Sequence, residues 1–391
     1  MTENAIGQRV RVLRESRQMT REEFAGALGV STDWVKKFET GQRQADPQLS
    51  VLRAIAHALG LTPAALLEDE TPRRQPSGAG ADTALLRAAL LAPMAGPVRQ
   101  VSLHEIWREC EHGFASFQAG NYTTLLASLP TLITTAKTLP DDPANARAAY
   151  RAHHLAATTL MKYGGGTAAW HAAERALEYA RTSRDPVATA LAAQTLVYAM
   201  TSIGEAHTGT STALDYAGAL ESDLSDGTVP ASTALGMLYL KGAVAAAACG
   251  QARTAHEMLQ RAEAHAENIP PGTNHLATGF DSLNVRLYRI SIDAALARYT
   301  TAARGADTIT LTALRTLPRE RRTHHLIEAA DIYSRIHRTE DALTALLEAE
   351  TDSPREITRP APRAVIETLL HAPGPVHDRL RALAHRAGIE A

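Results

Sequence analysis

The strongest constraint on the fold is a succession of amphipathic helical segments that runs from about residue 98 to the end of the chain. Residues that break helices interrupt it roughly every 15 to 20 positions. No window alternates apolar and polar residues with β-branched side chains, so we expect no strands. Aromatic residues make up only 5% of the 391 residues, so Ala and Leu must fill most of the core. These features predict an all-α chain.

Several of the segments open in the same way. AGNYTTLLASL begins at residue 119, GGTAAWHAAERALEYA at 165, GQARTAHEMLQRAEAHA at 250 and RTEDALTALLEAE at 338. A turn residue followed by Ala and Leu at spacings of three and four recurs at about 40 residues or a multiple of it. Small residues let paired helices approach closely, and each pair must bury its apolar face against the next. The pattern resembles tetratricopeptide repeats (TPR), although the repeat length drifts, and predicts a TPR-like α-solenoid over residues 99–391.

The sequence predicts seven consecutive helix pairs in this region. They are Ser102–Ala119 with Tyr122–Lys137, Ala144–Tyr163 with Thr167–Thr182, Pro186–Ile203 with Thr212–Ser222, Ala231–Cys249 with Ala252–Glu267, His275–Tyr299 with Ala302–Thr316, Arg319–Ile336 with Thr339–Glu350, and Pro362–Leu370 with Val376–Arg386.

One segment breaks this helical texture. Glu68–Asp82 reads EDETPRRQPSGAGAD, which is rich in charge, Pro and Gly and has little apolar surface to bury. It predicts a linker between an N-terminal domain (1–70) and the repeat domain (99–391). The connecting region, 71–98, contains one short apolar segment, Thr83–Ala92, which we expect to form a helix that docks on the solenoid.

The N-terminal block carries sharp helix signals. Thr20 and Glu23 form a capping-box pattern at the start of a second helix, and Gly29 supplies the turn that ends it. Ser31 then caps a third helix, Thr32–Thr40, which Gly41 stops. The other predicted helices are the first (Ile6–Arg17), the fourth (with Leu49, Leu52, Ile55, Ala56 and Leu59) and a short fifth (from Thr62–Pro63 to Leu67).

Helix two, the tight turn at Gly29-Val30-Ser31 and helix three have the spacing of a helix-turn-helix. The block resembles the phage repressor/Cro (XRE-type) DNA-binding domain through MTREEFAGALGVSTDWVKKFETGQR and LSVLRAIAHALGLTPAALL. The resemblance implies a five-helix domain that binds double-stranded DNA. It also implies that Arg14 and Glu39 form a structural ion pair.

The pattern of the third helix predicts which side chains contact DNA bases. Val35 and Phe38 face inward, and the opposite face is polar, as insertion into a major groove requires. Thr32 suits a thymine methyl, Lys36 or Lys37 suits guanine O6/N7, and Asp33 either accepts from cytosine N4 or orients Lys37 through an i, i+4 pair. We therefore predict base contacts for four residues: Thr32, Asp33, Lys36 and Lys37.

Phosphate contacts are predicted around the same helix. In the resembled family the first residue of helix two holds the DNA backbone, and Arg21 occupies that position. The other candidates flank helix three: Ser31, Thr40, Gln42 and Arg43. Residues 1–53 contain nine Lys and Arg against seven acids, an excess of only two. One such domain should bind weakly, so we expect a homodimer that reads an inverted-repeat operator.

The remaining His, Cys and Glu patterns do not match a catalytic, metal-binding or cofactor-binding motif, so we expect none of these sites. His104-Glu105 lacks the second His of an HExxH site, and the pairs His153-His154 and His324-His325 are interpreted as surface or interhelical residues. Cys110 and Cys249 fit a reducing compartment. No signal peptide is apparent at the start, and no apolar run approaches the length of a membrane span. We expect a non-enzyme in the cytoplasm, associated with the nucleoid and not with a membrane.

This domain arrangement resembles one-component regulators of Gram-positive bacteria, in whose peptide-sensing branch the repeats dimerise and bind a signal. FDSLNVRLYRISIDAAL, from residue 280, is similar to actinobacterial members. Within it, Asn284 is predicted either to bond the backbone of an extended peptide or to cap a helix. We expect a transcriptional regulator whose repeats dimerise and sense a peptide or small molecule. The alternative is a constitutive DNA-binding regulator whose repeats serve only dimerisation or docking.

Overall fold

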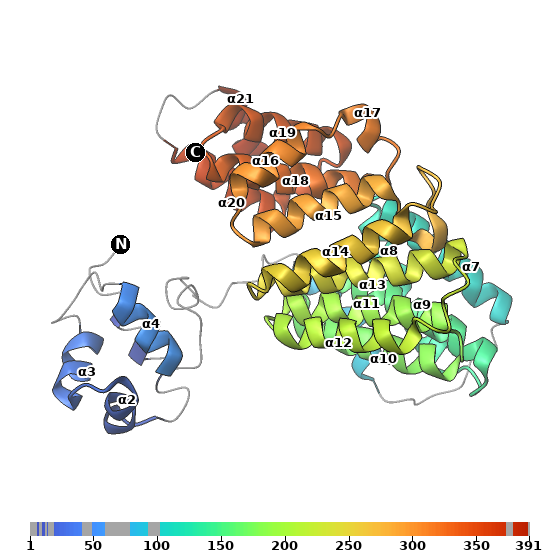
Figure 1. The fold of residues 1–391 in the computed structure, drawn as a ribbon, viewed down its shortest axis with the longest axis horizontal. Helices are drawn as coiled ribbons and strands as arrows, with labels where there is room; N and C mark the ends of the chain where they lie inside the picture. Colours follow the sequence, from blue (N-terminus) through green and yellow to red (C-terminus); the bar gives the residue numbers. More distant parts are fainter. Residues whose placement is uncertain are drawn as a thin grey trace. The chain divides into compact units, whose positions relative to one another are not determined.

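The computed structural model describes residues 6–7, 10–11, 14, 19–40, 49–58, 79–92, 102–372 and 378–389. Throughout these ranges the secondary structure is helical, without strands, as the sequence predicts. The chain divides into two compact units, Met1–Ser77 and Gly78–Ala391 (Figure 1). The boundary places the whole helix at 79–91 in the C-terminal unit.

The N-terminal unit contains α2 (Arg21–Leu28), α3 (Thr32–Glu39) and α4 (Leu49–Ala58), and residues 6, 7, 10, 11 and 14 are helical as well. Its core is small and apolar, comprising Val10, Phe24, Ala25, Val35, Phe38 and Ile55. The remainder of the first predicted helix, Gly41 and the predicted fifth helix lie outside the described residues.

The predicted caps of α2 and α3 are confirmed. The backbone N–H of Glu23 donates to Thr20 Oγ1 (3.1 Å), and the N–H of Thr20 donates to Glu23 Oε2 (2.8 Å). Gly29 has φ of 67°, a left-handed conformation that glycine adopts without a Cβ clash. Ser31 Oγ accepts from the N–H of Trp34 (3.2 Å). These caps fix the turn between the two helices.

The C-terminal unit is a series of antiparallel helix pairs. Its α-helices are α6 (Ala79–Leu91), α7 (Leu103–Gln118), α8 (Tyr122–Lys137), α9 (Pro143–Lys162), α10 (Gly166–Thr182), α11 (Pro186–Ser202), α12 (Ala206–Leu220), α13 (Val229–Ala248), α14 (Ala252–Ala266), α15 (Ser282–Ala295), α16 (Tyr299–Asp307), α17 (Leu311–Leu314), α18 (Arg319–Arg335), α19 (Thr339–Asp352), α20 (Pro360–Leu370) and α21 (Asp378–Arg386). Two short 3₁₀ helices, η1 (His275–Ala277) and η2 (Glu356–Thr358), lie in the connections.

Three regions differ most from the predicted helix bounds. The helix predicted over 275–299 is split into η1 and α15, because Leu276 (φ 55°) and Ala277 (φ 58°) are left-handed and Asp281 starts a new helix as its N-cap. The helix predicted over 302–316 is split into α16 and α17, and Thr310 Oγ1 caps the second piece. Helix α12 begins at Ala206, ahead of the predicted start at Thr212.

Helix α13 lies in the middle of the apolar core. By length and composition it could cross a membrane, contrary to the sequence-based expectation that no segment would, but 83% of its most apolar window is buried within the protein. Small residues allow this burial. At Gly236 the ring of Phe280 packs so closely that an added Cβ would lie 2.0 Å from its Cζ atom. The apolar surface of α13 is thus explained by packing between helices.

Helix α6 is docked on the repeats. Its Leu86 is fully buried in the same core as α8 and α9. The ammonium of Lys137, at the end of α8, donates to the carbonyls of Ala89 (2.7 Å), Leu90 (2.7 Å) and Ala92 (3.0 Å). Because these carbonyls lack partners within their own helix, Lys137 caps the end of α6. The docking matches the expectation, although the helix already begins at Ala79, so residues 79–82 of the predicted linker are helical.

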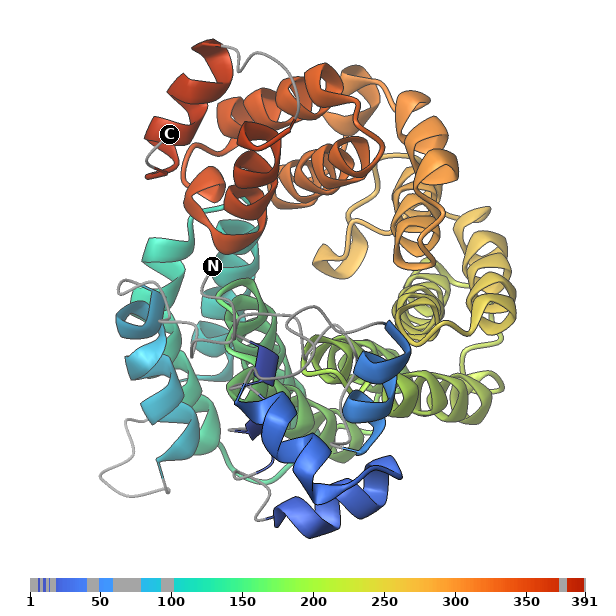
Figure 2. The ribbon, with the colours of Figure 1, turned by 90° about the vertical axis from the view of Figure 1, so that its left-hand side faces the viewer.

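The helix pairs curve until the last ones meet the first (Figure 2). Arg359, at the start of α20, donates to the carbonyl of Lys162 (2.7 Å) and places its guanidinium 4.7 Å from the ring centroids of both Tyr122 and Tyr163. Arg355 donates to Thr123 Oγ1 (2.8 Å). An open solenoid has contacts only between neighbouring repeats. Here contacts between distant repeats turn the concave face into a partly enclosed space.

Candidate functional sites: the exposed face of α3 and a charged pocket

Helix α3 has one apolar and one polar face. Val35, Phe38 and Glu39 are buried against the core of the N-terminal unit. The four residues predicted to contact bases, Thr32, Asp33, Lys36 and Lys37, are all exposed. The structure therefore brings the predicted reading residues to one accessible face, and contact with DNA itself stays a prediction.

The predicted i, i+4 pair between Asp33 and Lys37 is confirmed. The ammonium of Lys37 lies 2.7 Å from Asp33 Oδ2, and the two side chains are 46% and 66% exposed. An ion pair this exposed contributes at most about 1 kcal/mol, so a stronger partner can displace it at little cost. Asp33 thereby orients Lys37 without holding it tightly.

Beneath this face, Glu39 is the centre of a buried charge cluster. Arg14 Nε donates to Glu39 Oε1 (2.6 Å), which confirms the predicted pair, and Arg14 Nη1 donates to the carbonyl of Met19 (2.7 Å). Arg21 Nε donates to Glu39 Oε2 (2.8 Å). Sequence reasoning missed this second pair. Arg21 thus also holds α2 to α3. Because its Nε is hydrogen-bonded to Glu39, the predicted phosphate contact would come from the other nitrogens of its guanidinium.

The remaining predicted phosphate contacts are partly described. Ser31 is exposed and caps α3, and Thr40 is exposed with its hydroxyl donating to the carbonyl of Lys36 (2.8 Å). Gln42 and Arg43 lie outside the described residues. None of these four predictions is contradicted by the structure.

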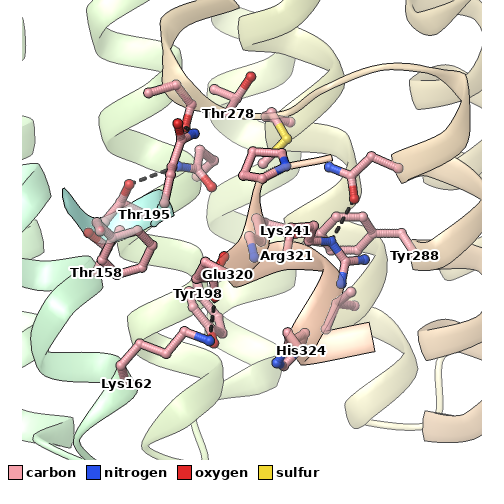
Figure 3. A pocket seen from close by; sticks show the side chains of 18 of the residues that line it. Thr158, Lys162, Thr195, Tyr198, Lys241, Thr278, Tyr288, Glu320, Arg321 and His324 are labelled. Atoms are coloured by element: carbon pink, nitrogen blue, oxygen red, sulfur yellow. Dashed lines mark hydrogen bonds and ion pairs between the residues drawn. The ribbon is translucent and has the colours of Figure 1, made fainter. Parts of the chain in front are cut away.

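A pocket of about 230 Å³ opens on the concave wall of the C-terminal unit (Figure 3). Its lining comes from α7, α9, α11, α13, α15 and α18 and from the segment around η1. The charged lining residues are three cations and two carboxylates: Lys162, Lys241, Arg321, Glu320 and Glu328.

Two of these residues neutralise each other. The ammonium of Lys162 and the carboxylate of Glu320 form an ion pair, and both side chains are 16% exposed. Desolvation opposes ionisation of both groups. The attraction prevails, so the pKa of Glu320 is lowered and the pKa of Lys162 is raised. The pair joins α9 to the start of α18 and closes one side of the pocket.

The second carboxyl group, that of Glu328, has different surroundings. Glu328 Oε2 accepts from Ser291 Oγ (2.7 Å), and desolvation by the surrounding helices raises the pKa of this carboxyl despite nearby Arg321 and Lys241. Desolvation and the same cations hold the pKa of His324 well below its ordinary value, so its imidazole is neutral at pH 7. Three cations thus line the pocket against two carboxyl groups, those of Glu320 and Glu328.

The two cations outside the Lys162–Glu320 pair are Lys241 and Arg321. The Lys241 ammonium lies 3.9 Å from the ring centroid of Tyr198 and 5.1 Å from that of Tyr288. The Arg321 guanidinium lies 4.9 Å from the Tyr288 centroid, and its Nε donates to Asn284 Oδ1 (2.6 Å). Within the part of the chain that the structure describes, neither cation has a carboxylate within ion-pair distance.

Of the two roles predicted for Asn284, capping a helix or bonding a ligand, the structure excludes the first. Asn284 does not cap α15: Asp281 is the N-cap, and its Oδ1 accepts from the N–H of Asn284 (2.8 Å). The Asn284 side chain lines the pocket and is 1% exposed. Its contact with Arg321 makes it a residue that positions a cation, and direct contact with a ligand stays a prediction.

Sequence reasoning missed the other pocket residues. A signal was available, because Glu320, His324 and Glu328 recur at intervals of four in a helix, which places them on one face. Of the two predicted alternatives for the paired histidines, surface or interhelical, the second holds for His153, His154 and His325, which are buried between helices. Within the described ranges no group of three His, Cys, Asp or Glu residues could hold a metal ion.

Comparison with known protein families identifies the domain type of the N-terminal unit. Residues 5–68 match the model of a helix-turn-helix domain. The N-terminal unit is a helix-turn-helix domain. Domains of this class place the second helix of the motif in the major groove of DNA.

Comparison with solved structures gives only distant similarity. The competence regulator ComR from Streptococcus vestibularis, in its apo form, is 14% identical, with 80% of this chain and 96% of that chain covered and a TM-score of 0.29. ComR from S. thermophilus, in complex with DNA and its signalling peptide ComS, is 12% identical, with 89% and 99% covered and a TM-score of 0.28. No curated protein sequence matches this chain.

Proposed function

We propose that this protein is a sequence-specific DNA-binding transcriptional regulator in which α3 is the recognition helix. The observation that carries the proposal is the exposed polar face of α3 in a helix-turn-helix domain. Thr32 and Asp33, near its N-terminus, are short enough for close approach to base edges, and Lys36 and Lys37 suit guanine.

We propose further that the regulator acts as a homodimer on an inverted repeat. Each chain has one recognition helix, and the first 53 residues carry a charge excess of only two. Two recognition helices that contact half-sites about one helical turn apart would bind DNA more tightly than one helix alone. The repeat domain would supply the dimer contacts.

The charged pocket supports a sensory role for the repeat domain, for a peptide or small-molecule effector. It lies on the concave wall, it contains convergent polar groups, and two of its cations have no carboxylate within ion-pair distance among the residues that the structure describes. Such a pocket is typical of a binding site. The proposal is therefore of a binding protein, not an enzyme, and it requires no cofactor.

In vitro selection tests the DNA-binding proposal. The full-length protein would be incubated with a random duplex library, and the enriched sequences would be titrated in mobility-shift assays. We expect an inverted repeat and two chains per duplex. The double variant Lys36→Ala/Lys37→Ala should lose enrichment, whereas Arg253→Ala, which removes an exposed cation on α14, should retain it. If the wild-type protein enriches no sequence, the proposed function is wrong.

A further inference from the structure

We propose that the concave pocket binds a ligand through a carboxylate group held by Lys241 and Arg321. The inference rests on the proposed function and deepens it, because it names the chemical class of the effector. The carboxylate belongs either to a small organic acid or to the C-terminus of a peptide, and the two share the chemistry that this pocket recognises.

The charge balance of the pocket is the first argument. Lys162 and Glu320 form an ion pair with each other. Glu328 accepts a hydrogen bond from Ser291, and the charges of Arg321 and Lys241 act on it although, among the described residues, neither cation lies within ion-pair distance of it. Lys241 and Arg321 are left facing tyrosine rings and a neutral amide. A cation that is partly withdrawn from water favours an anionic partner, so an arriving carboxylate would complete the site.

The second argument is convergence. The charged groups of Lys241 and Arg321 lie 5.1 and 4.9 Å from the centroid of one ring, that of Tyr288. They come from different helices, α13 and α18, so the fold brings them together. Asn284, which is almost completely buried, fixes the Nε edge of the Arg321 guanidinium at 2.6 Å. The terminal nitrogens of that planar fork suit a carboxylate, which accepts two parallel hydrogen bonds.

The size and remaining lining of the pocket limit the part of the ligand next to its carboxylate. The pocket volume of about 230 Å³ is below the range of about 300–1,000 Å³ that encloses drug-sized ligands. Met237, Val244 and Leu276 supply apolar surface beside the charged groups. The enclosed part of the ligand is therefore small and apolar: the body of a small acid or the last side chain of a peptide.

Calorimetric titration of the full-length protein tests the proposal with two pairs of probes. The first pair is phenylacetate and its neutral analogue phenylacetamide. The second is the tripeptide Ala-Ala-Phe with a free C-terminus and the same tripeptide as its C-terminal amide. We expect at least one acid to bind at least tenfold more tightly than its amide. Preference for phenylacetate would identify a small acid, and preference for the tripeptide would identify a peptide C-terminus.

Variants assign the binding to the two cations. Lys241→Met keeps the apolar stem, and Arg321→Gln keeps a donor for Asn284; each should weaken binding of the preferred acid at least tenfold. Lys241→Gln provides a second test if Lys241→Met lowers the helical circular dichroism signal. The control Arg253→Met removes one positive charge from an 89% exposed side chain on α14 and should bind normally. The proposal is overturned if neither acid is preferred to its amide, or if the folded Lys241 and Arg321 variants bind as wild type.

Measuring operator affinity with and without the preferred acid separates this inference from the proposed function. Selective acid binding without any operator binding would contradict the regulator and leave the pocket assignment standing. Operator binding without acid selectivity would contradict the pocket assignment alone. If both occur, the acid should change operator affinity and the operator should change acid affinity by the same factor, because linkage is reciprocal.

Discussion

Each unit of this protein contains a cluster of charged side chains beside its apolar core. The two clusters differ in whether their charges lie within ion-pair distance of an opposite charge. In the N-terminal unit, Glu39 is buried and receives Nε of both Arg14 and Arg21 at 2.6 and 2.8 Å. In the pocket of the C-terminal unit, Lys241 and Arg321 contact tyrosine rings and an amide. The buried charge of Glu39 is thus matched within its own unit, whereas among the described residues Lys241 and Arg321 have no carboxylate within ion-pair distance.

The two kinds of cluster should respond differently to substitution. A buried carboxylate between two guanidinium groups stabilises the fold mainly because removing it strands its partners. A cation above an aromatic ring contributes less, about 0.5–1 kcal/mol at an exposed position. Removal of Glu39 should therefore unfold its unit, whereas removal of Lys241 should affect mainly binding.

The largest expected effect is that of Glu39→Gln. It leaves buried Arg14 without its carboxylate, which costs about 3–5 kcal/mol in comparable ion pairs. The small core of this unit cannot offset such a loss. Amide hydrogen exchange should show lost protection in α2–α4 and unchanged protection in α7–α20. Glu22→Gln, at an exposed position of α2, is the control; equal exchange in both variants would show that the cluster is not structural.

The second effect concerns pH and the buried histidines of the repeats. Burial lowers the pKa of His154 to about 3, whereas the unfolded chain has about 6.5. Below pH 6.5 the unfolded state therefore binds more protons, and stability falls as the pH falls. One such group costs up to about 1.4 kcal/mol per pH unit, which amounts to about 2.3 kcal/mol between pH 6.5 and 4.5 because the unfolded histidine is only half protonated at pH 6.5. Urea denaturation of the C-terminal unit should show this decline, and His154→Phe should flatten it. An identical slope in the variant would contradict the assignment.

The third effect tests the close packing of α13. In Gly236→Ala the new Cβ would meet the ring of Phe280, and overpacking of this kind costs about 1–3 kcal/mol. In the control Gly218→Ala, on α12, no atom of the described residues outside the adjacent helix backbone lies within 4 Å of the new atom, so stability should rise by about 0.4–1 kcal/mol. Thermal unfolding should move the two variants in opposite directions. Equal shifts would mean that Phe280 relaxes freely.

Local signals in the sequence predicted much of the first unit. The sequence alone reveals features that act within a few residues. These are the Thr20 and Ser31 caps, the Gly29 turn and the helical spacing of Val35 and Phe38. The second partner of Glu39, Arg21, was missed because that contact depends on how α2 and α3 cross.

The pocket could not be predicted in the same way. Its charges come from α9, α13 and α18, and they meet only because the helix pairs curve until Arg359 reaches Lys162. Repeat periodicity predicts the pairs and says nothing about the angle accumulated between them. The left-handed residues Leu276 and Ala277 carry no sequence signal either, since glycine is the usual residue at such positions.

The central claim, that α3 reads DNA, is tested most directly by measuring base preference one position at a time. The selected site and its single-base variants would be titrated with wild-type protein, Lys37→Ala and Arg21→Ala. Lys37→Ala should lose about 1–3 kcal/mol on the selected site and relax preference at one base pair. Arg21→Ala should weaken all sites alike and reduce the salt slope by about one unit. Altered preference with Arg21→Ala and unaltered preference with Lys37→Ala would contradict the account.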